Sequence, residues 1–376
     1  MISAPRASVC GRTDSAPGTQ TPDNGRGSAR AREPVDGLAR KTGERHTYAA
    51  LDLGTNNCRL LIARAVPRGG GQDGFRVIDS FSRIVRLGEG LSRTGKLSAA
   101  AIERTLRALE ICRDKMNARG VTRARLIATE ACRSASNSAE FLDKVYQETG
   151  LELEIVDRET EARLAATGSA SLVDSAAESA VLFDIGGGSS ELVWLARSAT
   201  QCGQSNGRAL DQRIRFWASL KLGVVTLAEE FGGIEVSRET FEAMVDHVVR
   251  ELESFVARAG LERRCHRFHL LGTSGTVTTI AGVFLGLPRY DRRRVDGLWM
   301  SSCQVDHAVA SLRKMTYAER AANGCIGETR ADLVLAGCAI LEAIRQVFPA
   351  ERIRIADRGL RDGMLIQLIS ADRSLD

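Results

Sequence analysis

The chain has 376 residues, of which 43% are hydrophobic and 26% are charged, and its formal net charge is +5. This length exceeds that of one ordinary domain, and the composition is that of a globular protein with large cores. Aromatic residues make up only 5% of the chain and do not alternate with basic runs, which argues against specific nucleic-acid binding by base stacking. No apolar stretch approaches a membrane span, and the nine cysteines include no C-x-x-C pair, so we expect a cytoplasmic protein with reduced thiols and no membrane partner.

Predicted strands and helices alternate after a polar N-terminal segment. Residues 1–46 are rich in Gly, Ser, Pro and Arg and poor in large apolar side chains, so we predict a disordered tail there. From Tyr48 onward, short apolar runs predict strands and amphipathic spacing predicts helices. Strands are expected over 48–53, 59–64, 75–85, 125–129, 153–156, 180–184, 269–271 and 353–356; helices are expected over 98–119, 138–149, 237–255, 304–315 and 329–347, and from near Glu159, after Thr276 and near Arg358.

This order of elements predicts an α/β protein with two domains, over residues 47–168 and 169–376. The small, polar segment 167–178 is the expected crossing between them. We expect the last helix, from Arg358, to pack back on the first domain.

The most informative feature is a turn that occurs twice. The run Asp52–Leu60 (DLGTNNCRL) aligns with the run Asp184–Leu192 (DIGGGSSEL), and each joins two apolar strands. One such turn would be typical of an ordinary hairpin, but the pair favours phosphate binding. Glycines let backbone N–H groups approach phosphate oxygens, and a leading Asp can hold Mg²⁺ directly or through water. The candidate phosphate-binding residues are Asp52, Gly54, Thr55, Asn56, Asn57, Arg59, Gly186, Gly187, Gly188 and Ser189.

A third glycine loop follows the strand that ends at Leu271. It contains Gly272, Thr273, Gly275 and Thr276 and precedes an apolar helix. A tight strand-to-helix turn can have the same composition. Because unpaired amides at a helix N-terminus attract anions, we add these four residues to the predicted phosphate site.

Together these segments resemble the exopolyphosphatase/guanosine pentaphosphate phosphohydrolase (Ppx/GppA) phosphatase family of the actin-like ATPase (ASKHA) superfamily. The resemblance extends from about Tyr48 to Leu368. Besides the two turns and the glycine loop, it is carried by the runs ATEACR (128–133), EARL (161–164), LKLGVV (220–225) and RGLRDG (358–363). The chain departs from the family pattern at Thr160, where a second acid is usual, and in the first turn, where the family commonly has Ser-Asn-Ser.

The resemblance implies two ribonuclease-H-like domains with a phosphate-binding cleft between them, and Mg²⁺-dependent hydrolysis of a terminal phosphoanhydride bond. It places the general base on Glu161. We assign Arg133 to grip the terminal phosphate, and Asp184, assisted by Glu191 or Asp52, to bind Mg²⁺. The expected substrates are inorganic polyphosphate and guanosine pentaphosphate or tetraphosphate, and a homodimer is an expectation for the family.

Two rival hypotheses belong to other functional classes. A sugar or acid kinase of the same superfamily would share both turns, and a non-catalytic sensor would bind polyphosphate or the guanosine compound without cutting it. The Glu161 run favours hydrolysis over both, because a pure binding protein needs no base. The basic loop Arg289–Arg294 fits either a polyanion contact or a solvated charge run.

Overall fold

The structure is a computed structural model that describes residues 46–66, 74–197, 210, 212–259 and 268–373. The tail predicted over residues 1–46 lies outside this part of the chain, except for His46. The described residues all belong to one compact unit. None of the described helices combines the length and the apolar character that a membrane crossing requires.

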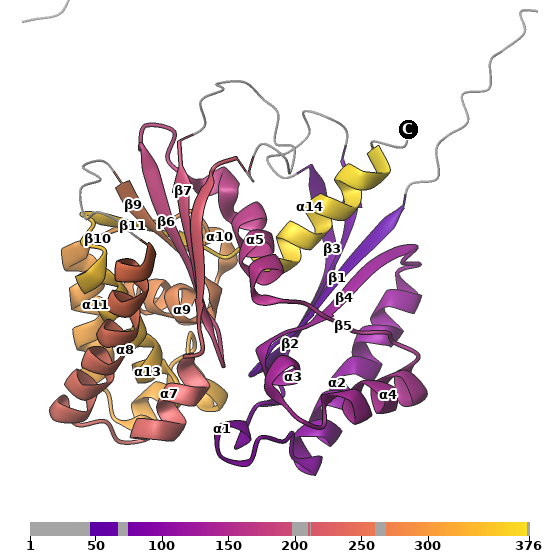
Figure 1. Cartoon of the computed structure of the whole chain (residues 1–376), viewed down its shortest axis with the longest axis horizontal. Coiled ribbons are helices and arrows are strands. Elements are labelled where there is room, and N and C mark those ends of the chain that lie inside the picture. Colours follow the sequence, from indigo (N-terminus) through magenta and orange to yellow (C-terminus); the bar gives the residue numbers. More distant parts are fainter. Residues whose placement is uncertain (1–45, 67–73, 198–209, 211, 260–267, 374–376) are drawn as a thin grey trace, which may run out of the picture. The chain divides into compact units, whose positions relative to one another are not determined.

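The described residues form two mixed sheets and the helices that cover them (Figure 1). Their bounds are β1 (Thr47–Leu53), β2 (Asn57–Ala65), β3 (Phe75–Ile84), α1 (Leu91–Thr94), α2 (Ala99–Ala118), β4 (Arg123–Ala128), α3 (Glu130–Ser134), α4 (Ser138–Thr149), β5 (Glu154–Ile155), α5 (Arg158–Ser169), η1 (Ala170–Leu172), β6 (Ser179–Ile185), β7 (Ser190–Ala196), β8 (Ile214–Leu220), α7 (Val224–Phe231), α8 (Arg238–Ala259), β9 (Phe268–Thr273), α9 (Ser274–Phe284), α10 (Arg292–Val295), β10 (Trp299–Ser301), α11 (Ser302–Lys314), α12 (Tyr317–Ala322), η2 (Glu328–Arg330), α13 (Val334–Val347), β11 (Arg352–Ala356) and α14 (Leu360–Arg373).

The two sheets share the order of their first four strands. The first runs β3-β2-β1-β4-β5, and the second, read from the matching edge, runs β8-β7-β6-β9-β11-β10. In each sheet the strand before the predicted turn pairs antiparallel with the strand after it and parallel with the fourth strand of the sheet in chain order, β4 or β9. The repeat seen in the two turns therefore extends to both sheets, and the predicted α/β layering is confirmed.

Strand β1 is buried on both faces, which explains its continuous apolar sequence. Ala49, Leu51 and Leu53 belong to a core that includes residues of α2 and α4. Tyr48 and Ala50 point to the opposite face, where they belong to a core with residues of α5 and α14. Period-two alternation along the strand thus divides its side chains between two cores.

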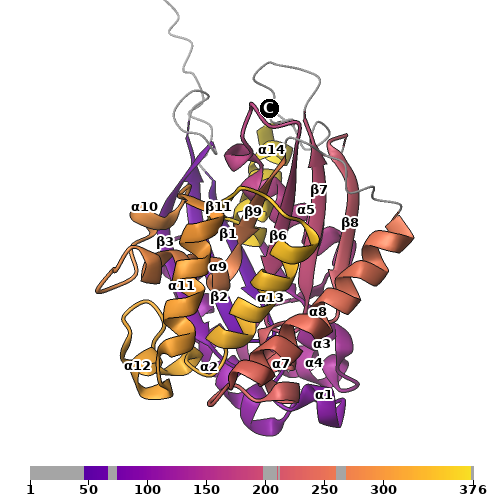
Figure 2. The ribbon, with the colours of Figure 1, turned by 90° about the vertical axis from the view of Figure 1, so that its left-hand side faces the viewer.

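The second sheet has the larger core. Val181, Phe183 and Ile185 of β6 belong to a cluster with α8, α9, α11 and α13. Figure 2 shows α8, α11 and α13 in front of the strands of this sheet. Leu182 of β6 belongs to a separate cluster with Ala162, Ala165 and Ala166 of α5. Helix α5 therefore covers the opposite face of the second sheet.

Helices α5 and α14 cross at glycines, side by side as Figure 1 shows. A Cβ atom on Gly363 would lie 2.0 Å from the carbonyl oxygen of Leu164, and one on Gly168 would lie 2.0 Å from that of Gly359. The backbones approach so closely that no side chain fits between them. Because α14 also packs against β1, this crossing links the end of the chain to the first sheet. The domain boundary at residue 168 stays a prediction.

The structure shifts some element bounds and adds short helices. Helix α13 begins at Val334 instead of residue 329, because η2 occupies 328–330, and α14 begins at Leu360 instead of Arg358. Strand β5 has only two residues. The helices α1, α3, α7, α10 and α12 were not predicted, since four to eight residues are too few to show helical periodicity.

Candidate active site

The two predicted turns have the same backbone geometry. In the first hairpin Asp52 pairs with Arg59 and Leu53 with Cys58; in the second, Asp184 pairs with Glu191 and Ile185 with Ser190. The Gly54 N–H donates to Asn57 O at 2.9 Å, and the Gly186 N–H donates to Ser189 O at the same distance. These two amides therefore close their own turns, and the phosphate donors must come from the other residues.

The turns meet tip to tip. A Cβ atom on Gly188 would lie 2.6 Å from Thr55 Oγ1, and one on Gly187 would lie 3.0 Å from Thr55 Cβ. Gly223 closes the back of the second turn, where its own Cβ would lie 2.4 Å from the carbonyl carbon of Gly187. Glycine is needed at these positions because backbone and side chains of the facing segment occupy the space.

The third glycine loop joins the same site at the start of α9. The hydroxyl of Thr273, the N-cap residue, donates to Arg358 O and not to the helix, so the first amides of α9 lack a side-chain cap within the described residues. Ser274 has a φ of 90°, a strained conformation for a residue with a side chain, and its hydroxyl donates to Ile185 O at 2.8 Å. The N-terminus of α9 is thus held against the second turn, and its uncapped amides are of the kind that attract anions.

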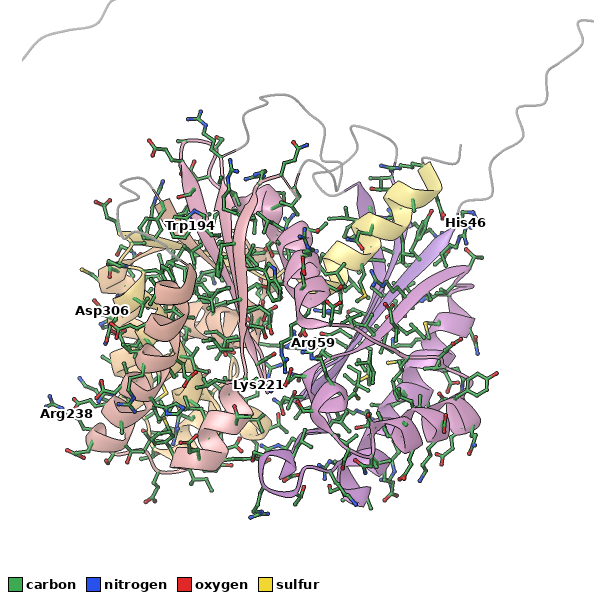
Figure 3. All side chains as sticks on the ribbon, in the orientation of Figure 1. His46, Arg59, Trp194, Lys221, Arg238 and Asp306 are labelled. Carbon is green, nitrogen blue, oxygen red and sulfur yellow. The ribbon has the colours of Figure 1, made fainter. Side chains whose placement is uncertain are left out.

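A cleft between the sheets brings these elements together. Its lining combines both turns, the N-terminus of α9, the start of α5 and the segment that precedes α14. Of the predicted site residues, all within the described ranges, Gly272 and Arg133 do not line it. Gly272 instead packs against Phe183, which lies 2.7 Å from where its Cβ would be. Figure 3 shows the side chain of Arg59 in the region between the two sheets.

Four carboxylates of the cleft are buried close to one another, and their pKa values are raised. Burial raises the pKa of Asp184 to about 6, with Arg59 opposing and Asp52 adding to the shift. Burial also raises the pKa of Asp52, although the positive charges of Arg59 and Arg361 lower it. The pKa of Glu191 lies well above its usual range because of burial and the charges of Glu161 and Asp184. Because burial and mutual repulsion disfavour the charged forms of these acids, a cation bound among them would stabilise those charged forms.

Glu161 stands at the start of α5. The helix begins there because the Asp157 carboxylate accepts a capping hydrogen bond of 2.7 Å from Thr160 N. Burial raises the pKa of Glu161 to about 7, while Arg133 lowers it and the charges of Asp52 and Asp184 raise it. A carboxylate with a pKa near neutral is suited to accept a proton from water.

Arg133 lies beside Glu161. Its Nη2 donates to Glu161 Oε2 at 2.9 Å, its Nη1 to Val156 O at 2.6 Å, and its Nε to Glu130 Oε2 at 3.1 Å. The guanidinium is thus engaged on three sides, which favours a role in holding Glu161. The direct phosphate contact expected for Arg133 stays a prediction.

Sequence reasoning missed five charged residues that line the cleft: Glu130, Arg330, Asp357, Arg358 and Arg361. Burial and the nearby charge of Arg59 lower the pKa values of Arg330 and Arg361. Close, desolvated guanidinium groups are unfavourable without an anion between them. Arg361 belongs to the RGLRDG run and was assigned only to packing. Arg330 belongs to no motif, so nothing in the sequence marked it.

The residues present fit a magnesium ion. Carboxylate oxygens are the ligands that Mg²⁺ prefers, and it commonly takes one or two from the protein and the rest from water and phosphate. Among the described residues no three acids, histidines or cysteines already converge on one point. The side-chain oxygens of Asn56 and Asn57 are buried without a hydrogen-bond partner in this part of the chain, which leaves acceptors for water at the first turn.

The two sheets and the paired turns are those of the actin-like two-domain fold. The profile of the Ppx/GppA phosphatase family matches residues 61–371. The chain therefore belongs to the Ppx/GppA phosphatase family, which confirms the resemblance noted in the sequence.

Individual relatives agree with this assignment. The chain is 26% identical over 329 residues to a bifunctional 3-dehydroquinate synthase/phosphatase of Fusobacterium nucleatum, which covers 85% of this chain but only 46% of that protein. It is 27% identical over 337 residues to exopolyphosphatase 2 of Mycobacterium tuberculosis, covering 85% and 98% of the two chains. The crystal structure of the Ppx/GppA family member of Aquifex aeolicus superposes with a TM-score of 0.68 at 26% identity, over 87% of this chain and 98% of that one. The predicted two-domain actin-like fold is thereby confirmed.

Proposed function

We propose that this protein hydrolyses the terminal phosphoanhydride bond of inorganic polyphosphate in a Mg²⁺-dependent reaction. The observation that carries the proposal is the meeting of the two turns at Thr55, Gly187 and Gly188 in a cleft that also contains the buried carboxylate of Glu161. A polyanion would find there two glycine turns, a helix N-terminus and the side chains of Arg59, Arg330 and Arg361. Membership of a phosphatase family and the name of the Mycobacterium tuberculosis relative support the same reaction.

In this mechanism the protein positions charge more than it makes bonds. The backbone of the turns and the N-terminus of α9 hold the phosphate chain, and Arg59, Arg330 and Arg361 balance its charge. Glu161 takes the proton of a water molecule that attacks the terminal phosphorus opposite the leaving oxygen. Arg133 keeps the Glu161 carboxylate aimed into the cleft.

We assign Mg²⁺ to Asp184, with Glu191 or Asp52 assisting through water. When bound, the ion supplies charge neutralisation for the phosphate oxygens and for the carboxylates around it. The high pKa values of Asp184 and Glu191 support this assignment, because each acid gains its charge more easily beside a cation.

The test compares phosphate release from polyphosphate, guanosine pentaphosphate and ATP, with and without Mg²⁺. We expect Mg²⁺-dependent release from polyphosphate and poor release from ATP, and the comparison decides whether the guanosine compound is a second substrate. Equal or better turnover of ATP with transfer to an added sugar would show a kinase instead.

The variant Glu161→Gln separates the enzyme from a non-catalytic sensor. It should lower turnover by roughly 10²- to 10⁴-fold and leave binding of polyphosphate intact, because it removes the base and keeps the shape. Glu159→Gln is the matched control, since Glu159 is on the same helix, is 46% exposed and pairs with Arg163. A sensor would show the same negligible turnover before and after the change.

A further inference from the structure

Arg86 has a backbone conformation that a residue with a side chain rarely adopts. Its φ is 48°, and within the described residues only Ser274, in the glycine loop of the cleft, shares a positive φ among non-glycine residues. Such strain persists only when surrounding contacts hold it, and it concentrates at functional positions. Arg86 does not line the cleft, so its contacts must explain why the strain is retained.

The backbone around Arg86 supports the first phosphate turn. The N–H groups of Val85 and Arg86 both donate to Asn56 O, at 2.9 and 3.0 Å, and Gly88 N donates to Thr55 O at 2.9 Å. A Cβ on Gly88 would lie 2.3 Å from Thr55 Cγ2. Segment 85–88 therefore fixes the two residues of the first turn that touch the second turn.

The side chain of Arg86 reaches the other side of the cleft. Its Nη2 donates to Thr329 O at 3.1 Å and to Asp332 Oδ1 at 2.9 Å. Both acceptors flank Arg330 along the chain, and the side chain of Arg330 lines the cleft. The Arg86 side chain is 33% exposed and that of Asp332 is 20% exposed, so the pair is partly shielded from water.

Arg330 needs to be held in place. Arg59 Nη2 and Arg330 Nη1 lie 3.4 and 3.7 Å from the position of a Cβ on Gly275, so two guanidinium groups face one point at the start of α9. Their charges repel until an anion lies between them. A segment that carries one of these charges would relax away from the other unless another contact fixed it.

We propose that Arg86 is a positioning residue that ties the first phosphate turn to segment 329–332 and thereby holds Arg330 against the substrate phosphate. This inference rests on the proposed function, since it names a further residue of the same site. The strained backbone of Arg86 lets its N–H donate to Asn56 of the first turn while its guanidinium donates to segment 329–332. Loss of the tie weakens anion binding more than the chemical step, because Arg330 then has to be ordered at binding.

The first test is the affinity for inorganic tripolyphosphate, measured by titration calorimetry in the Glu161→Gln background. Arg86→Met should weaken binding roughly tenfold, since it removes two hydrogen bonds from a charged donor. In the enzyme with Glu161 intact, the same change should raise KM by a similar factor and alter kcat little. Arg107→Met is the matched control, because Arg107 is 68% exposed on α2 and pairs with Glu103.

A double-mutant cycle shows whether Arg86 acts through Arg330. With Arg330→Met already present, Arg86→Met should weaken tripolyphosphate binding by less than about twofold, because the Arg330 guanidinium that Arg86 positions is already absent. An equal loss in both backgrounds, or a loss no larger than that of Arg107→Met, would overturn the inference.

The variant Arg86→Gly separates loss of the Arg86 side chain from misfolding, because glycine adopts a φ of 48° without strain. It should keep the melting temperature and still weaken binding roughly tenfold; wild-type affinity in this variant would also overturn the inference. Failure of the proposed function is distinguishable, because it would appear as tripolyphosphate binding without phosphate release by the protein with Glu161 intact.

Discussion

Arg133 and Glu161 form a hydrogen-bonded ion pair of 2.9 Å in which both side chains are nearly buried. The same guanidinium lies 2.7 Å from the carboxylate of Glu130, which also binds Arg158. Glu161 therefore shares its counter-charge with a second acid. Burial, together with the charges of Asp52 and Asp184, outweighs the effect of Arg133 and raises the pKa of Glu161 to about 7.

Arg133→Gln should move the acidic limb of the pH–rate profile to higher pH. The base works when deprotonated, so activity falls as the pH drops below its pKa, and removal of the positive charge raises that pKa further. The measurement is kcat/KM between about pH 5 and about pH 9. Arg158→Gln, which removes an arginine that donates to Glu130 and not to Glu161 within the described residues, should shift the limb less. A profile for Arg133→Gln that superimposes on the wild-type profile would contradict this role.

Asp184→Asn should increase the Mg²⁺ concentration needed for half-maximal activity by roughly tenfold or more, because one charged oxygen ligand is lost. The measurement is phosphate release by chelator-treated protein as Mg²⁺ is added back. Asp143→Asn serves as the control, since Asp143 is an exposed residue of α4. An unchanged Mg²⁺ dependence of Asp184→Asn would remove Asp184 from the metal site.

Gly363→Ala should destabilise the fold by about 1–3 kcal/mol, because its methyl group would lie 2.0 Å from the Leu164 carbonyl oxygen and the helices would have to separate. The free energy of unfolding is measured by urea titration. Ser370→Ala changes an exposed position of the same helix and should leave this free energy nearly constant. Equal stability of the two variants would show that α5 and α14 are not tightly packed in solution.

The charge of Asp79 should stabilise the first sheet above about pH 4. Its hydrogen bonds with Lys115 and Arg119 lower its pKa to about 2, from an ordinary value of 3.8. A lowered folded-state pKa gives stability that is present above pH 4 and is lost as the pH falls from about 4 toward 2. Asp79→Asn should therefore cost about 1 kcal/mol at neutral pH after allowance for solvent screening.

The check on Asp79 is urea unfolding of both proteins at several pH values. The difference in unfolding free energy should narrow as the pH is lowered from about 5 to about 3. A difference that stays constant over this range would mean that the charge of Asp79 contributes nothing.

The sequence by itself determined the repeated turn, because glycine spacing and flanking apolar strands are local features that can be identified directly in the sequence. It also determined the α/β order of elements, whereas the candidate base Glu161 came from the family resemblance that the EARL run helps to carry. Local patterns carry this information since strands and helices follow the periodicity of their own residues.

Only the tertiary structure decided which side chains share the cleft. Arg330 lines the cleft, and Arg86 donates to the segment that carries Arg330. Neither arginine belongs to a motif, because both positions depend on contacts between segments that are distant in the chain. Arg133 was predicted to contact the terminal phosphate. In the structure its guanidinium lies beside Glu161, because hydrogen bonds to Glu130 and to the carbonyl of Val156 orient it. Contacts between segments that are distant in the chain determine where these charged side chains lie, and a local sequence pattern does not contain that information.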